Sequence, residues 1–147
     1  MSKKGFTLVE LMIVVVIMAI LVAVAVPIYS AVTANAKKKT CIGNQREIVS
    51  SIGNAVMLSG AAITEEKTIK VKTATDADEG TWDFTAWGVT ATGLTDQDIK
   101  DLFKTVPFCP GKADNEITIK VKTETDGSKA KVNTSCTDTT HVLKVGS

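Results

Sequence analysis

The sequence predicts an α+β protein in which a long N-terminal helix packs on an antiparallel sheet of about four strands. Three patterns predict this fold: an apolar run from Phe6 to Val26, an amphipathic helical stripe after it, and later segments in which apolar residues alternate with lysine. The length of 147 residues fits a single domain, and 17 basic against 16 acidic side chains give a net charge of +1. So balanced a charge creates no field that would gather nucleic acid or an anionic membrane.

The apolar run is long enough to cross a membrane as a helix. Only a threonine and a glutamate interrupt it between Phe6 and Val26. As a helix it would extend roughly 31 Å, about one hydrocarbon thickness. Two lysines precede it, and positive charge holds that end on the cytoplasmic side. These features are those of a membrane span that tethers a domain.

The same run can also be interpreted as a cleaved secretory signal. It has a basic start, an apolar middle, and small residues at Ala23 and Ala25 that fit a cleavage site. Such a signal would be removed, and the mature chain would then begin at Val26.

Glu10 is the residue that neither interpretation needs. A carboxylate inside an apolar span costs about 2.5–3.5 kcal/mol on insertion scales, so it is expected to be functional and to have a partner. If the chain is cut after Gly5, Phe6 carries a new α-amino group four residues from Glu10. This amine, on the same chain or on a neighbouring copy, is the predicted partner, because a desolvated amine and carboxylate pair well with each other and badly with lipid.

Residues 4–12, which read Lys-Gly-Phe-Thr-Leu-Val-Glu-Leu-Met, resemble the prepilin processing motif of type IV pilins. The resemblance implies that a prepilin peptidase cleaves between Gly5 and Phe6. It also implies N-methylation of Phe6 and a role for Glu10 in assembly. Pro27 stands where the family usually has a proline that bends the first helix, and an aromatic residue follows shortly after it.

The resemblance implies a pilin-like fold and a structural protein, the major subunit of a type IV pilus, rather than an enzyme, and no cofactor. Its partners would be further copies of itself in a helical homopolymer, the prepilin peptidase and N-methyltransferase, an assembly ATPase with its membrane platform, and membrane lipid before assembly. The chain would first lie in the cytoplasmic (inner) membrane and later in an extracellular surface pilus, the kind of filament used in adhesion and motility.

Other functions share these N-terminal features. A major pseudopilin of a type II secretion system is one, and family pseudopilins carry a calcium site in their C-terminal loops. Here the available acids form no compact ligand string: Asp76, Asp78, Glu79, Asp126 and Asp138. A minor or competence pilin is a further variant, and a secreted or tethered binding domain would need Glu10 to be incidental. Contact of the lysine-rich strands with DNA or a host surface is not indicated, since neighbouring acids dilute their charge.

After Pro27 the predicted helix becomes amphipathic. Its apolar residues recur at helical spacing and predict one buried face: Ile42, Val49, Ile52 and Val56. Polar residues between them, Gln45 included, are expected to face solvent. Ser59-Gly60 predicts the end of the helix near Leu58. The chain thus divides into a cleaved leader, an apolar helix, an amphipathic helix and a β-rich head, at residues 1–5, 6–27, 28–58 and 59–147.

The head contains a near-repeat. The string Thr-Ile-Lys-Val-Lys-Thr begins at Thr68 and again at Thr118, and it predicts strands over 68–76 and 118–126. Asp126-Gly127 predicts a hairpin turn. A returning strand is expected over 130–135 and a last strand over 141–145.

Between the two copies, Thr95 and Asp98 form the signature of a capping box, which predicts a short helix that runs to about Lys104. The segment 81–94 contains Trp82, Phe84 and Trp87. It is expected to be a loop or connecting strand whose aromatic side chains close one end of the core.

Three cysteines allow one disulfide. The extracellular exposure that the resemblance implies favours oxidation, and a bridge near the C-terminus also resembles the pilin pattern. We expect Cys109 to pair with Cys136, which would contribute roughly 3–4 kcal/mol by closing a loop. Cys41 would then be a buried free thiol. Pairing of Cys41 with either other cysteine, and three unpaired thiols, remain open.

A zinc site is weighed against this pairing. Cys109, Cys136 and His141 offer three ligands, but their spacing fits no common zinc finger and no fourth ligand is evident. No metal is therefore expected, and His141 is expected to be an ordinary surface or strand residue.

Overall fold

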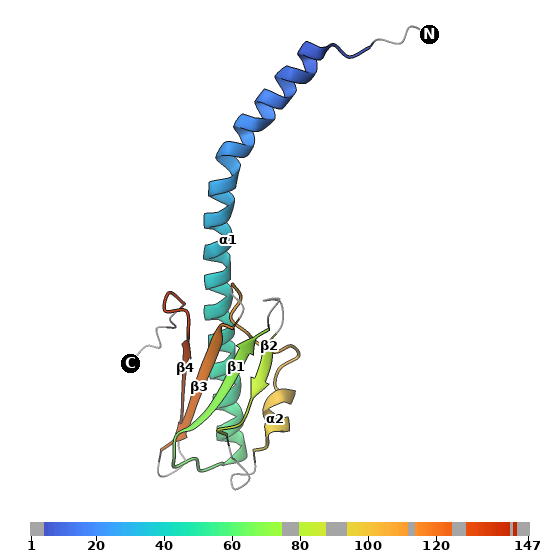
Figure 1. Ribbon diagram of the computed structural model, residues 1–147. Coiled ribbons are helices and arrows are strands. Elements are labelled where there is room, and N and C mark those ends of the chain that lie inside the picture. Colours follow the sequence, from blue (N-terminus) through green and yellow to red (C-terminus); the bar gives the residue numbers. More distant parts are fainter. Residues whose placement is uncertain are drawn as a thin grey trace. The chain divides into compact units, whose positions relative to one another are not determined.

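The computed structural model describes residues 5–74, 80–87, 94–111, 114–124, 129–141 and 143. Figure 1 shows the described elements in the order α1, β1, β2, α2, β3 and β4. They form a long N-terminal helix packed with a four-stranded antiparallel sheet, so the predicted α+β, pilin-like architecture is confirmed. By internal contacts the chain divides into two compact units, Met1–Ala36 and Lys37–Ser147.

The helix α1 spans Leu8–Ser59 and contains Pro27. Gly60 follows it with a φ of +64°, the left-handed conformation that commonly ends a helix at glycine, so the predicted end is confirmed. Among the helices of the described residues, only α1 is long and apolar enough to cross a membrane.

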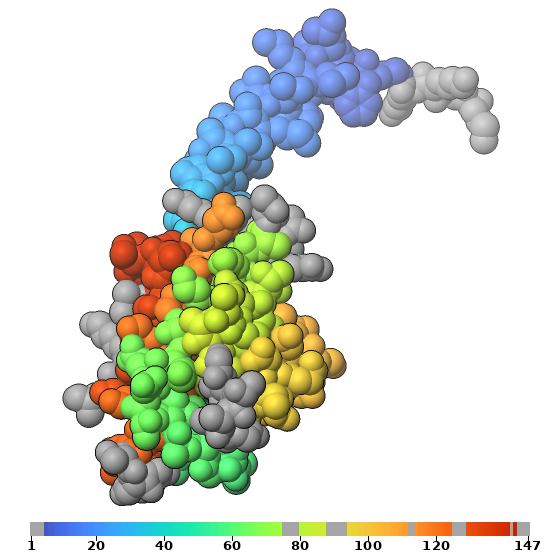
Figure 2. Space-filling view, turned by 60° about the horizontal axis from the view of Figure 1, so that its bottom comes forward, coloured from blue at the N-terminus to red at the C-terminus, as the bar shows by residue number. Residues whose placement is uncertain are grey.

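The first half of α1 exposes its apolar side chains. The large apolar side chains from Phe6 to Val32 are 45–82% exposed. Figure 2 shows this part of the helix, in blue, with its side chains uncovered on the face in view. Since a soluble protein rarely exposes so extended an apolar surface, this half of α1 is expected to be covered by lipid or by other molecules.

The second half of α1 packs against the sheet and forms the core with it. The buried residues of the helix recur at spacings of four, three, four and four: Cys41, Gln45, Ile48, Ile52 and Val56. Ile42 and Val49, which were predicted to lie in the buried stripe, are only partly buried. The prediction that Gln45 faces solvent is wrong, because hydrogen bonds inside the head satisfy its amide and allow it to be fully buried.

The four strands lie in the order β2-β1-β3-β4, and each neighbouring pair is antiparallel. Their bounds are Lys67–Thr73 for β1, Gly80–Asp83 for β2, Glu116–Thr123 for β3 and Ala130–Cys136 for β4. Three of the predicted strands are thus confirmed, with β1 and β3 shorter than expected. The predicted strand over 141–145 is wrong where the structure describes it, since His141 and Leu143 lie in no strand. The Asp126-Gly127 turn lies outside the described residues.

The two copies of the near-repeat pair with each other. In the register of β1 and β3, Ile69 lies opposite its counterpart Ile119. Thr68 pairs with Lys120 and Lys70 with Thr118, so the pairing is symmetric about the two isoleucines. The apolar residues of both strands are fully buried on one face, as the alternation predicts.

The opposite face of the sheet carries the lysines, and acids neutralise three of them. Lys70 Nζ lies 3.0 Å from Glu116 Oε1, and Lys72 Nζ lies 3.2 Å from Asp83 Oδ2. A third pair joins Lys120 to Glu66 at 2.8 Å. These partly exposed pairs add little stability, but they reduce the positive charge of this face of the sheet.

The short helix α2 spans Asp96–Asp101 and has the predicted cap. The backbone N–H of Thr95 donates to Asp98 Oδ2 at 2.7 Å, and the backbone N–H of Asp98 donates to Thr95 Oγ1 at 3.2 Å. The helix ends three residues before the expected Lys104. The aromatic residues of the neighbouring segment pack as expected, with Trp87 fully buried and Trp82 stacked on Phe84.

Replacing Ile119 by alanine tests the assignment of the buried face. We expect Ile119→Ala to lower the free energy of unfolding by about 2–5 kcal/mol, because it removes a fully buried side chain at the centre of the sheet. Denaturant titration of the full chain in detergent, followed by tryptophan fluorescence, measures this change in the head, where both tryptophans lie. Lys122→Ala, on the exposed face of the same strand, should change it by less than about 0.5 kcal/mol. Equal losses in the two variants would contradict the assignment.

Candidate functional site

Thr7 and Glu10 cap the start of α1. The backbone N–H and the hydroxyl of Thr7 both donate to Glu10 Oε2, at 2.9 Å and 2.8 Å. In return the backbone N–H of Glu10 donates to Thr7 Oγ1 at 3.3 Å. This reciprocal arrangement is a capping box, which satisfies backbone donors that the first turn of a helix leaves free. The Thr-x-x-Glu spacing is the signal for it, and the sequence analysis recognised that signature only at Thr95.

The predicted cleavage position lies just before the helix. Gly5 and Phe6 are exposed and belong to no helix or strand. A Cβ added to Gly5 would have no described atom within 4 Å, apart from its chain neighbours, and its φ is not in the left-handed range. The described fold therefore does not require glycine at this position. A requirement for glycine here would have to come from a second molecule that approaches the backbone closely.

Pro27 lies within α1, and hydroxyl side chains bond to carbonyls of the turns around it. Ser30 Oγ donates to the carbonyl of Pro27 at 2.9 Å, and Thr33 Oγ1 donates to the carbonyl of Tyr29 at 3.0 Å. Proline has no N–H, so the carbonyl one turn earlier loses its usual helical partner. A role for Pro27 in assembly stays a prediction.

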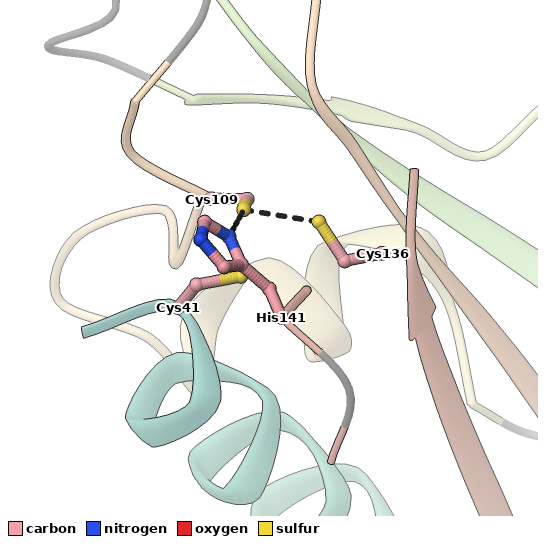
Figure 3. Close-up of side chains that lie close together, drawn as sticks. All are labelled: Cys41, Cys109, Cys136 and His141. Carbon is pink, nitrogen blue, oxygen red and sulfur yellow. Dashed lines mark hydrogen bonds between the residues drawn. The ribbon is translucent and has the colours of Figure 1, made fainter. Parts of the chain in front are cut away.

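Three cysteines and the histidine form a second site, where α1 meets the head. Figure 3 shows Cys41, Cys109, Cys136 and His141 pointing toward one another. One ligand atom from each residue, Sγ or a ring nitrogen, lies within 4.8 Å of the others. The Sγ atoms of Cys136 and Cys109 are 3.0 Å apart, and Cys109 Sγ is 3.1 Å from His141 Nδ1.

The cluster corrects one expectation and leaves another open. His141 is only 6% exposed and lies after the last strand, so its prediction as an ordinary surface or strand residue is wrong. Cys41 is buried as expected, but the sequence analysis did not place it beside the other two cysteines. All three cysteines are free in this structure, and the pairing of Cys109 with Cys136 stays a prediction.

Hydrogen bonds from two elements hold Cys109 in place. The side-chain amide of Asn44, on α1, donates to the carbonyl of Phe108 at 2.6 Å. The hydroxyl of Thr73, the last residue of β1, donates to the carbonyl of Cys109 at 2.9 Å. The loop that carries Cys109 is thus tied both to the helix and to the sheet.

Gln45 joins the helix to the segment after β4. Its Nε2 donates to the carbonyl of His141 at 2.8 Å and contacts Cys41 Sγ at 3.4 Å. Its Oε1 accepts a hydrogen bond from the hydroxyl of Thr134 at 3.2 Å. Because these partners come from β4 and the chain beyond it, no local pattern in the helix could have predicted that Gln45 is buried.

The three thiols have different acidities because they contact one another. Hydrogen bonds from Cys109 and then Cys41 lower the pKa of the Cys136 thiol to about 3. The hydrogen bonds to Cys136 and Cys41, together with burial, raise the pKa of Cys109. For Cys41 the contact with Cys109 lowers the pKa, but the contact with Cys136 and burial outweigh it and raise the pKa to about 12.

The fold has a pilin-like architecture, and the N-terminal segment carries the matching motif. Residues 1–26 match the family described as the prokaryotic N-terminal methylation motif, which is the signature of type IV pilins and prepilins. The resemblance of residues 4–12 to the prepilin motif is thereby confirmed. The motif implies processing by a prepilin peptidase, fits anchoring in a membrane before assembly, and indicates a structural protein. No curated protein and no solved structure matches the chain.

Replacing Gln45 by leucine tests the buried polar contacts of the head. We expect Gln45→Leu to lower the free energy of unfolding by about 1–3 kcal/mol, because it leaves the His141 carbonyl and the Thr134 hydroxyl without this partner. Denaturant titration followed by tryptophan fluorescence measures the change. Arg46→Leu makes a similar polar-to-apolar change at the next, exposed position of α1 and should have little effect. An unchanged stability in Gln45→Leu would show that these contacts contribute nothing.

Proposed function

We propose that this chain is the major structural subunit of a type IV pilus, anchored in the membrane before assembly and polymerised through the first half of α1. The observation that carries the proposal is the exposed apolar surface from Phe6 to Val32, joined to the methylation motif at the same end of the chain. Lipid covers this surface before assembly. Neighbouring helices of the same kind cover it in the filament.

Processing of the N-terminus prepares the chain to leave the lipid and join the filament. A prepilin peptidase removes residues 1–5 at the cytoplasmic face of the membrane, and Phe6 is then methylated on its new amine. An assembly ATPase and its membrane platform drive insertion into the growing filament. The chain thereby moves from the cytoplasmic membrane to the cell surface.

Glu10 sets the register between neighbouring subunits. Lipid and apolar side chains are alike, so burial alone gives little preference for one register over another. The carboxylate of Glu10 on an arriving subunit neutralises the amine of Phe6 on a subunit already in place. A misplaced subunit would leave both charges buried and unpaired, at a cost of several kcal/mol.

The capping box is compatible with this pairing. Both bonds from Thr7 go to Oε2 of Glu10, and Oε1 accepts no hydrogen bond within the part of the chain that the structure describes. An amine from a neighbouring subunit can therefore approach Oε1 while Oε2 still caps the helix. In an isolated subunit the cap lowers the cost of placing the carboxylate at the membrane face, because two donors already satisfy it.

A major pseudopilin of a type II secretion system is the main alternative, with a minor or competence pilin as a further variant. Of the acids considered for a pseudopilin calcium site, Asp138 caps the turn that follows β4 by accepting hydrogen bonds from Thr140. The others lie outside the described residues: Asp76, Asp78, Glu79 and Asp126. Electron microscopy distinguishes these functions, because long surface fibres made mainly of this chain support a major pilin and a short periplasmic filament supports a pseudopilin.

The mature N-terminus tests the processing step. Mass spectrometry of the membrane-extracted chain should find N-methylated Phe6 as the first residue. Gly5→Ala should leave the leader attached, because the peptidase would no longer reach the backbone closely enough. Ser2→Ala, a change of similar size within the leader, should be processed normally. A first residue of Val26 would instead support a cleaved secretory signal.

Variants of the capping pair separate the two contributions of Glu10. Glu10→Ala should be processed but yield at least about tenfold less fibre, the effect of losing 1.4 kcal/mol or more per added subunit. Glu10→Gln keeps an oxygen that can cap the helix but removes the charge, and it should lose as much fibre. Thr7→Val keeps the charge and removes the hydroxyl, and it should assemble nearly normally.

Sedimented fibre per cell and the mature N-terminus are measured together, so that a processing defect is not mistaken for an assembly defect. A normal fibre yield from Glu10→Gln would show that capping, and not the charge, is what assembly needs.

A further inference from the structure

Four side chains that bind transition metals meet inside the compact unit Lys37–Ser147, each from a different part of the chain. Cys41 lies on α1, Cys109 lies between α2 and β3, Cys136 ends β4, and His141 follows β4 (Figure 3). Their ligand atoms lie within 4.8 Å of one another. A tetrahedral site with bonds of about 2.3 Å to sulfur and about 2.0–2.1 Å to nitrogen places its ligand atoms about 3.5–3.8 Å apart. The cluster is already near that geometry, since two of its distances are 3.0 Å and 3.1 Å and none exceeds 4.8 Å.

We propose that Cys41, Cys109, Cys136 and His141 form a structural zinc site. Three cysteines with one histidine are among the common ligand sets of structural zinc, and four protein ligands leave no open position for a substrate. The location fits this role, because Cys41 and Cys109 are fully buried and His141 nearly so. Binding converts the three thiols to thiolates and releases their protons to solvent.

The surroundings of the sulfurs suit thiolate ligands. A thiolate bound to a metal is stabilised by N–H groups that face it. Two such groups face the sulfurs: the side-chain amide of Gln45 at Cys41 (3.4 Å) and the side-chain amide of Asn115 at Cys109 (3.9 Å).

The histidine has a carboxylate close to its far nitrogen, where the hydrogen-bond partner of a zinc-bound imidazole usually lies. Its Nδ1 faces the sulfurs, 3.1 Å from Cys109 Sγ. Its Nε2 lies 3.6 Å from Oδ2 of Asp138. A carboxylate on the far nitrogen fixes the orientation and tautomer of a ligating histidine. Asp138 is itself fixed, since its Oδ1 accepts hydrogen bonds from the backbone and hydroxyl of Thr140.

A disulfide between Cys109 and Cys136 would use the same two sulfurs, so a given chain holds either the disulfide or the metal. The disulfide would bond only Cys109 and Cys136, and it would leave Cys41 and His141 without a covalent or metal bond. Zinc engages all four and links α1 directly to the sheet and to the segment after it. All four residues lie within the compact unit Lys37–Ser147, away from the exposed apolar half of α1, so the proposal stands whichever filament the chain builds.

Metal content and thiol count of the intact protein test the proposal directly. The full chain is extracted in detergent without chelator or reductant, and zinc is measured by elemental analysis. We expect about one zinc ion per chain and three reactive thiols after denaturation with a chelator. A metal-free chain with a single reactive thiol would overturn the proposal in favour of the disulfide.

Spectroscopy and variants identify the ligands. Cobalt(II) added to the reduced, chelator-stripped chain should give the visible bands of a tetrahedral thiolate site.

Cys41→Ser should lower the affinity for zinc at least tenfold, whereas the predicted disulfide would not involve Cys41. Asp138→Asn leaves every ligand in place and should weaken zinc binding about 10–100-fold. Its smaller perturbation keeps the test decisive if Cys41→Ser does not fold. Ser50→Ala, at an exposed position on the same helix, should bind zinc normally.

Zinc bound with unchanged affinity by both Cys41→Ser and Asp138→Asn would overturn the proposed ligand set. Cobalt bands of an octahedral, thiolate-free site would overturn it as well.

Discussion

The exposed apolar surface of the first half of α1 is the constraint on which the rest of the molecule depends. A helix satisfies its own backbone hydrogen bonds, so it is stable in lipid and in contact with other helices. Its large apolar side chains from Phe6 to Val32, however, stay exposed in the part of the chain that the structure describes. The chain must therefore be inserted, covered or assembled before it is stable in the cell. The carboxylate of Glu10 is tolerated in this apolar surface only where hydrogen bonds or an opposite charge stabilise it. The backbone N–H and the hydroxyl of Thr7 supply two such hydrogen bonds within the chain.

The head has to be stabilised with the other half of the helix alone. Five buried residues of α1, from Cys41 to Val56, face the apolar side of the sheet. Hydrogen bonds then connect the helix to two loops. Asn44 bonds to the carbonyl of Phe108 in the loop before β3, and Gln45 bonds to the carbonyl of His141 after β4. The Cys–His cluster lies at the first of these five buried positions. Such crosslinks suit a domain with so small a core, because they restrict segments that hydrophobic packing alone leaves weakly held.

Patterns within one element predicted the fold, and contacts between distant elements account for what they missed. The apolar run, the lysine alternation and the Thr95 cap each act over a few residues, so they could be recognised from the sequence. The burial of Gln45 and His141 could not, because each depends on the other across 96 positions. The cysteine cluster was missed for the same reason: Cys41 on the helix lies far along the chain from the other three ligands. The cleavage site after Gly5 stays a prediction; the sequence alone could suggest it because recognition by an enzyme, like a helix cap, depends on a short string of residues.

The symmetric pairing of β1 with β3 has a consequence for crowded conditions. The two strands share the string Thr-Ile-Lys-Val-Lys-Thr and meet about Ile69 and Ile119. Either strand therefore finds in a second molecule nearly the same partner that it has in its own. When many heads unfold side by side, exchange of strands between them conserves most of the cross-strand contacts. Refolding at low protein concentration should then favour separate heads, whereas refolding at high local concentration should favour heads that have exchanged strands.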